Sequence, residues 1–142
     1  MRWILRKNRI FVLLSMIAIV FAILACNAFD GKAGLSNIHM ATDETGKTST
    51  TLYSPGDAFY AFADLNELKS GSIVMAKWYV INAASVEGNS EINTSDYTYV
   101  SGIHFVYFKL TTNDGSDWPV GSYKVEFYLD GVLAGGQTFV VQ

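Results

Sequence analysis

The chain has a single cysteine, Cys26, and only two histidines, His39 and His104, among its 142 residues. One cysteine cannot form an internal disulfide, so any folded domain here must be held together by packing alone. A Ser or Cys nucleophile needs a neighbouring base, and the chain offers two isolated imidazoles and no G-x-S-x-G motif. We therefore expect no enzyme, no catalytic residue and no cofactor.

Basic residues are scarce beyond the N-terminus. Four of the ten Lys and Arg residues lie within the first nine positions, which leaves six against the thirteen Asp and Glu residues. A chain with this balance and no basic cluster is poorly suited to neutralise phosphates, so we expect no nucleic-acid partner. The carboxylates are scattered rather than paired for glycosidase chemistry, and they are interpreted as solvated surface charge.

The first 26 residues stand apart from the rest. Arg2, Arg6, Lys7 and Arg9 precede an uncharged run from Ile10 to Ala25, which is followed by Cys26. A basic start, an apolar run and a small residue before the cut are the parts of an export signal. Positive charge resists transfer, so the chain that follows is expected outside the cytoplasm.

The tetrapeptide Ile23-Leu24-Ala25-Cys26 resembles the bacterial lipobox. In lipoproteins the cysteine thiol receives a diacylglyceryl group, the preceding peptide bond is cut, and the new N-terminus is often acylated. The resemblance makes Cys26 the lipidation site, with acyl chains such as palmitate, because two or more chains hold a protein stably at a bilayer. Two alternatives remain open: a retained transmembrane helix, which needs about 20 apolar residues, and a soluble secretory signal cut after Ala25 or Ala28.

The sequence predicts three segments: a signal peptide over residues 1–25, a flexible tether over 26–36, and one domain over 37–142. The tether is small, polar and contains glycine, as a flexible linker should be. The remaining length suits a single β-sandwich.

Alternating apolar residues predict an all-β domain of about seven antiparallel strands. A helix is the alternative for residues 59–69. The expected strands are Leu35–Thr42, Ser49–Tyr53, Ala58–Leu65, Ile73–Ile81, Tyr97–Val100, Ile103–Thr111, Tyr123–Leu129 and a last one ending at Val141. Asn82–Ser95 is expected to be a long polar interruption.

The stretch GSYKVEFYLDGVLAGGQTFVV resembles the closing hairpin of bacterial immunoglobulin-like domains. Gly121 stands two residues before Tyr123, as in the tyrosine corner of immunoglobulin-like and fibronectin type III folds. Asp130-Gly131 is typical of a two-residue hairpin turn. Trp78 resembles the buried tryptophan of such folds. The resemblance implies an antiparallel immunoglobulin-like β-sandwich but no particular ligand.

Other candidate sites carry little signal. Tyr and Trp side chains expected to point outward could form a platform for sugar rings, or could instead pack between sheets and loops: Tyr97, Tyr99, Tyr107, Tyr128 and Trp118. A copper site from His39, His104, Met40 and Met75 is conceivable, but adjacent strand residues such as His39 and Met40 point to opposite faces. The loop at Asp114 and Asp117 lacks the acids of a calcium loop. We expect no metal.

These observations predict a lipid-anchored protein of the bacterial cell envelope, on the extracytoplasmic face of a membrane. Its role is expected to be that of a non-enzymatic binding or adaptor module with a protein or glycan partner. A carbohydrate- or cell-wall-binding module is the alternative, and a copper-handling protein comes third.

Overall fold

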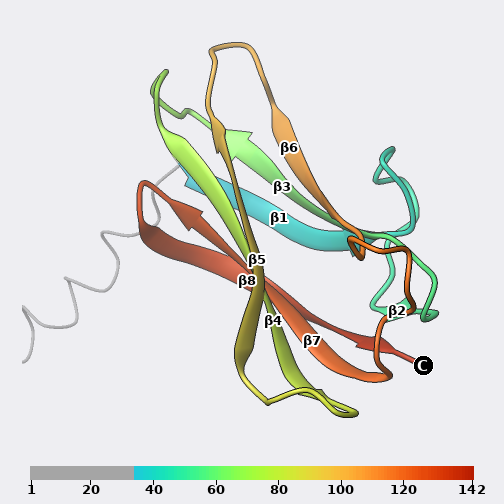
Figure 1. Ribbon diagram of the computed structural model, residues 1–142. Helices are drawn as coiled ribbons and strands as arrows, with labels where there is room; N and C mark the ends of the chain where they lie inside the picture. Colours follow the sequence, from blue (N-terminus) through green and yellow to red (C-terminus); the bar gives the residue numbers. More distant parts are fainter. Residues whose placement is uncertain (1–33) are drawn as a thin grey trace, which may run out of the picture. The chain divides into compact units, whose positions relative to one another are not determined.

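The computed structural model describes residues 34–142. They form eight strands in two packed layers (Figure 1): β1 (Gly34–Ala41), β2 (Leu52–Tyr53), β3 (Phe59–Asn66), β4 (Ile73–Ala83), β5 (Ser90–Thr98), β6 (Phe105–Leu110), β7 (Gly121–Leu129) and β8 (Val132–Val141). The predicted signal peptide and Cys26 lie outside the described residues. β1 begins at Gly34, within the stretch 26–36 that the sequence assigned to the tether.

One sheet has three strands in the order β1-β3-β6, and the other has five in the order β2-β8-β7-β4-β5. Neighbouring strands are antiparallel except for the short β2, which runs parallel to β8. The prediction of an all-β antiparallel sandwich is confirmed. The helical alternative for residues 59–69 is wrong, because Phe59–Asn66 pairs with β1 on one side and β6 on the other. None of the segments described is a helix long and apolar enough to cross a membrane.

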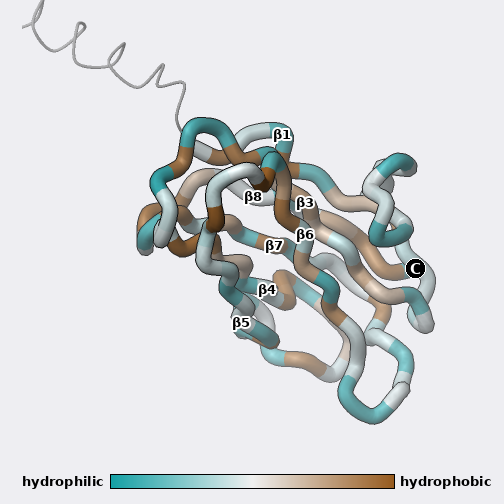
Figure 2. The backbone as a smooth tube through the Cα atoms, turned by 90° about the horizontal axis from the view of Figure 1, so that it is seen from above, coloured by the Kyte–Doolittle hydropathy of each residue, from teal (hydrophilic) through white to brown (hydrophobic). Residues whose placement is uncertain are grey.

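The core lies between the two sheets and follows the predicted alternation. Side chains at every second position of β3, β4, β6 and β7 are buried, and Trp78, Phe59 and Phe127 are each 0% exposed. Hydrophilic residues gather in the loops that connect the strands (Figure 2). Burial of one face of each strand is the main stabilising contribution, because apolar surface is removed from water on both inner faces.

The start of β7 forms the predicted tyrosine corner. The Tyr123 hydroxyl donates a hydrogen bond to the Pro119 carbonyl at 2.5 Å, and the ring stacks against Phe139 with centroids 5.6 Å apart. A tyrosine bound back to the backbone a few residues upstream fixes the connection that enters this strand. Gly121 is required nearby, because a Cβ there would overlap the Asn82 carbonyl oxygen and Ala83.

The β7–β8 hairpin also forms as predicted. Asp130 and Gly131 have φ angles of 49° and 83°, the positive values that a type I′ turn requires. The Asp130 carboxylate additionally accepts a hydrogen bond from the Ile73 N–H at 2.8 Å, which ties the turn to the start of β4.

The region between β4 and β6 differs from the prediction. The expected polar interruption Asn82–Ser95 is largely strand, since β4 continues to Ala83 and β5 covers Ser90–Thr98 rather than 97–100. β5 is the outermost strand of its sheet and pairs only with β4. Backbone hydrogen bonds hold such an edge strand, so its side chains need not show the apolar alternation of a central strand.

Candidate binding surfaces

The five aromatic residues considered for a platform do not share one surface. Tyr97, Tyr99 and Trp118 pack against the core. The Trp118 ring stacks on Phe59 at 4.7 Å, and its Nε1–H donates to the Asp57 carbonyl at 3.0 Å. The remaining two lie on different sheets, Tyr128 on β7 and Tyr107 on β6. The packing alternative holds for three of the five.

The residues considered for copper do not converge either. Met40 is 1% exposed within the core, whereas Met75 lies in the other sheet, opposite Tyr128. The His39 ring nitrogen Nδ1 lies 2.8 Å from the Asn37 carbonyl oxygen. Within residues 34–142 no three His, Cys, Asp or Glu side chains are grouped so as to hold a metal ion.

The loop considered for calcium forms a local turn. The Asp114 carboxylate accepts a hydrogen bond from the Ser116 N–H at 3.0 Å, the geometry of an Asx turn. Hydrogen bonds from Ser116 also lower the pKa of Asp114. The carboxylate therefore stabilises its own turn.

A different set of rings gathers on the outer face of the three-stranded sheet. We call this set the aromatic face: His39, Tyr60, Phe62, Phe105 and Tyr107. Strand register places His39, Phe62 and Tyr107 side by side on β1, β3 and β6. The His39 and Tyr107 rings stack on opposite sides of Phe62, each with centroids 5.3 Å away. Phe105 and Tyr60 extend the row diagonally, 6.2 Å from Phe62 and 6.3 Å from Tyr107 respectively.

Phe62 is only 4% exposed although it points away from the core. Its two ring neighbours cover its faces, and Gly46 of the β1–β2 loop lies so close that a Cβ there would be 2.9 Å from the ring. Phe105 and Tyr107, by contrast, are 53% and 39% exposed. The aromatic face therefore has a buried, closely packed ring at its centre and exposed rings along β6, which we call its open side.

Charged groups lie at the two ends of the open side. Asp64 is opposite Phe105 in the register and accepts a hydrogen bond from the Asn37 side-chain amide at 3.1 Å. Lys109 is opposite Tyr60, with its ammonium 5.5 Å from the ring centroid. The surface is therefore apolar in the middle, acidic at one end and basic at the other.

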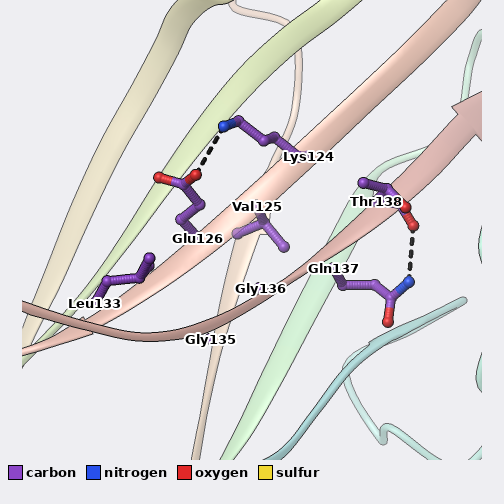
Figure 3. A pocket seen from close by; sticks show the side chains of 8 residues that line it. All are labelled: Lys124, Val125, Glu126, Leu133, Gly135, Gly136, Gln137 and Thr138. Atoms are coloured by element: carbon purple, nitrogen blue, oxygen red, sulfur yellow. Dashed lines mark hydrogen bonds and ion pairs between the residues drawn. The ribbon is translucent and has the colours of Figure 1, made fainter.

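The outer face of the five-stranded sheet is polar and hydrogen-bonded within itself. Lys124 lies 2.7 Å from the Glu126 carboxylate, which also accepts a hydrogen bond from the Tyr128 hydroxyl at 2.7 Å. These bonds lower the pKa of Glu126. A shallow hollow of about 350 Å³ lies beside this pair, over Gly135 and Gly136 of β8 (Figure 3).

Of the two surfaces, the aromatic face is the better candidate for binding a partner. The charges beside the hollow already neutralise one another, whereas Phe105 and Tyr107 expose apolar rings to water on a rigid sheet. Contiguous exposed apolar surface is typical of interaction sites, and aromatic side chains contribute much of the energy in binding interfaces.

Comparison with known proteins agrees with this architecture. No protein-family model and no curated protein sequence matches the chain. Among solved structures, an immunoglobulin-like protein from Pseudomonas aeruginosa superposes with a TM-score of 0.54 at 13% identity, covering 79% of this chain and 99% of that one. The fold is immunoglobulin-like. At this identity the likeness extends to the fold alone, and the immunoglobulin-like domain must be interpreted from its own surfaces.

Proposed function

We propose that this protein is a non-enzymatic binding module, held on the extracytoplasmic face of a bacterial membrane by lipid on Cys26. Its partner, a protein or glycan of the cell envelope, binds the aromatic face. The observation that carries the proposal is the exposure of Phe105 and Tyr107 beside the buried ring of Phe62. A fixed ring flanked by exposed ones forms a surface that is ordered before binding, which lowers the entropic cost of association.

The two histidines give no support to an enzymatic role. The His39 ring stacks on Phe62 and contacts the Asn37 carbonyl, so its position is explained by packing. His104 precedes β6, and its carbonyl oxygen accepts the Leu65 N–H at 2.8 Å. The contacts of the His39 ring include no nucleophile, which general-base catalysis requires.

The lipid anchor is supported by the lipobox resemblance of Ile23–Cys26 and by the small, polar stretch that follows it. It is tested by expressing the full chain and Cys26→Ala in bacteria fed radiolabelled palmitate. The wild-type chain should carry label and sediment with membranes. Cys26→Ala should carry none, and should be either released or left unprocessed. Labelled, mature-sized Cys26→Ala in the membrane fraction would contradict the anchor.

The binding surface is tested by placing the photo-reactive residue p-benzoylphenylalanine at Phe105 in the anchored chain. Thr94, an exposed residue on the edge strand β5, is the matched control position. Irradiation of intact cells should give an adduct from position 105 and at least fivefold less from position 94. Absence of any adduct at 105, or equal yields at both positions, would overturn the assignment of the aromatic face.

A further inference from the structure

β6 is an edge strand of the three-stranded sheet. It pairs with β3 alone, in an unbroken register from Phe59↔Leu110 to Asp64↔Phe105. The Leu65 N–H donates to the His104 carbonyl at 2.8 Å, so Leu65 and His104 form a hydrogen-bonded pair of the ladder. Because hydrogen-bonded and non-hydrogen-bonded pairs alternate in an antiparallel ladder, Phe105, Tyr107 and Lys109 direct their backbone N–H and C=O groups away from β3.

Two other edge strands of the sandwich, β5 and β1, carry features that discourage strand addition. β5 carries Glu91 and Asp96, and its register with β4 is broken between Trp78 and Tyr79. β1 has a register break between Ser36 and His39, with Asn37 at a φ of 49°. Charges and bulges are common devices against edge-to-edge pairing. β6 has no bulge and no proline, and Lys109 is its single charged residue.

The free side of β6 is complementary to itself. If a second copy lies antiparallel with Tyr107 opposite its own symmetry mate, Phe105 faces Lys109 of the copy and Lys109 faces Phe105. This register aligns all three outward-directed residues of each strand, whereas a shift by two residues leaves one of them unmatched. Since these residues carry the free backbone groups, the aligned register pairs every one of them.

The side chains agree with that register. Asp64 lies across from Phe105 on β3, so a copy places its Lys109 beside Phe105, at the acidic end of the aromatic face and two strand spacings from Asp64, about 10 Å. The two-fold symmetry repeats the same contact at the other end. Opposite charges therefore approach at both ends, while the exposed rings of Phe105 and Tyr107 gain neighbouring side chains from the copy on the same face of the extended sheet, and two-fold symmetry repeats each contact.

We propose that the partner of the aromatic face is a second copy of this chain, docked edge to edge along β6 with Tyr107 on the two-fold axis. The inference rests on the proposed function and names its partner. One strand pair is a small interface, below the roughly 1,200 Å² of stable complexes. Association should therefore be weak in dilute solution and favoured on a membrane, where tethering raises the effective concentration.

The test uses the full chain in bacterial membranes and the variant Tyr107→Cys. Hydrogen-bonded partners in an antiparallel pair have Cα atoms about 5.5 Å apart, within the range that a disulfide spans. Mild oxidation should join Tyr107→Cys into a covalent dimer with at least tenfold higher yield than Asp96→Cys on β5. The wild-type chain gives the baseline due to Cys26. Equal yields at positions 107 and 96 would overturn the proposal.

Charge reversal in the Tyr107→Cys background tests the register. Lys109→Asp or Asp64→Lys alone should lower the disulfide yield about fivefold, because like charges then face each other across Phe105 at both ends. The double variant, Asp64→Lys with Lys109→Asp, should restore it. Failure of the double variant to recover would contradict the docking geometry.

Failure of this inference is distinguishable from failure of the proposed function. If position 105 cross-links to another protein or to a glycan and Tyr107→Cys stays monomeric, the second-copy proposal is overturned and the binding face stands. If position 105 gives no adduct at all, the proposed function itself fails.

Discussion

Replacing Tyr123 by Phe should remove one partly buried hydrogen bond while keeping the ring that fills the core. The Tyr123 side chain is 1% exposed, and its hydroxyl donates to the Pro119 carbonyl at 2.5 Å. A buried hydrogen bond contributes about 1 kcal/mol net, and an acceptor left without a partner adds a further cost of about 1–3 kcal/mol when it is fully buried. Pro119 is only half-buried, so water can partly replace the hydroxyl. We expect a loss of about 1–1.5 kcal/mol in the free energy of unfolding.

The loss is measured by urea denaturation followed by circular dichroism. The midpoint should fall with an unchanged slope, since the surface exposed on unfolding stays the same, and the melting temperature should fall by about 4–8 °C. Tyr60→Phe, which removes a hydroxyl at a half-buried position on the aromatic face, is the matched control and should cost less than about 0.5 kcal/mol. If Tyr123→Phe is no more destabilising than Tyr60→Phe, the tyrosine corner does not stabilise the entry to β7.

Two further predictions concern β7 and β8. Gly136→Ala should lower the free energy of unfolding by about 1–3 kcal/mol, because the new Cβ would lie 2.6 Å from the Val125 carbonyl oxygen. The control Gly135→Ala should cost less, because its Cβ would meet only the movable tip of the Ile38 side chain, at 2.8 Å. Denaturation midpoints of the two variants are compared, and equal losses of stability would contradict this prediction. Glu126→Gln tests acid stability: hydrogen bonds from Lys124 and Tyr128 hold the pKa of Glu126 below its ordinary value of 4.5, so this carboxylate stabilises the fold above that pH and loses its contribution as the pH falls. The wild-type chain should therefore lose more stability than Glu126→Gln between pH 7 and pH 3, and parallel losses would contradict the assignment.

Features set by neighbouring residues could be predicted from the sequence. The tyrosine corner depends on residues within a few positions of Tyr123, and the turn of the β7–β8 hairpin depends on Asp130-Gly131. A few adjacent residues were therefore enough to predict both features. The buried faces of β3, β4, β6 and β7 followed from alternation, because one side of each strand meets the core. β5 was mostly missed, since it is held by backbone pairing and its polar side chains gave no alternation.

The aromatic face could not be predicted, because it depends on strand pairing. His39, Phe62 and Tyr107 are far apart in the sequence and become neighbours only through the register of β1, β3 and β6. Phe62 occupies an outward position in the alternation and yet is buried, owing to rings on the adjacent strands and Gly46 of a distant loop. For Trp118 the sequence left exposure and packing open, and the structure places its ring against Phe59, a contact set by the loop before the tyrosine corner.

The most direct test of the central claim is whether the aromatic face is occupied in its native membrane. Hydroxyl-radical labelling with mass spectrometry should be run on intact membranes and on the purified chain at high dilution. Phe105 and Tyr107 should be labelled at least threefold less in membranes, while Val132, 69% exposed in the β7–β8 hairpin, should be labelled equally in both. Equal labelling of Phe105 and Tyr107 in the two samples would contradict the account.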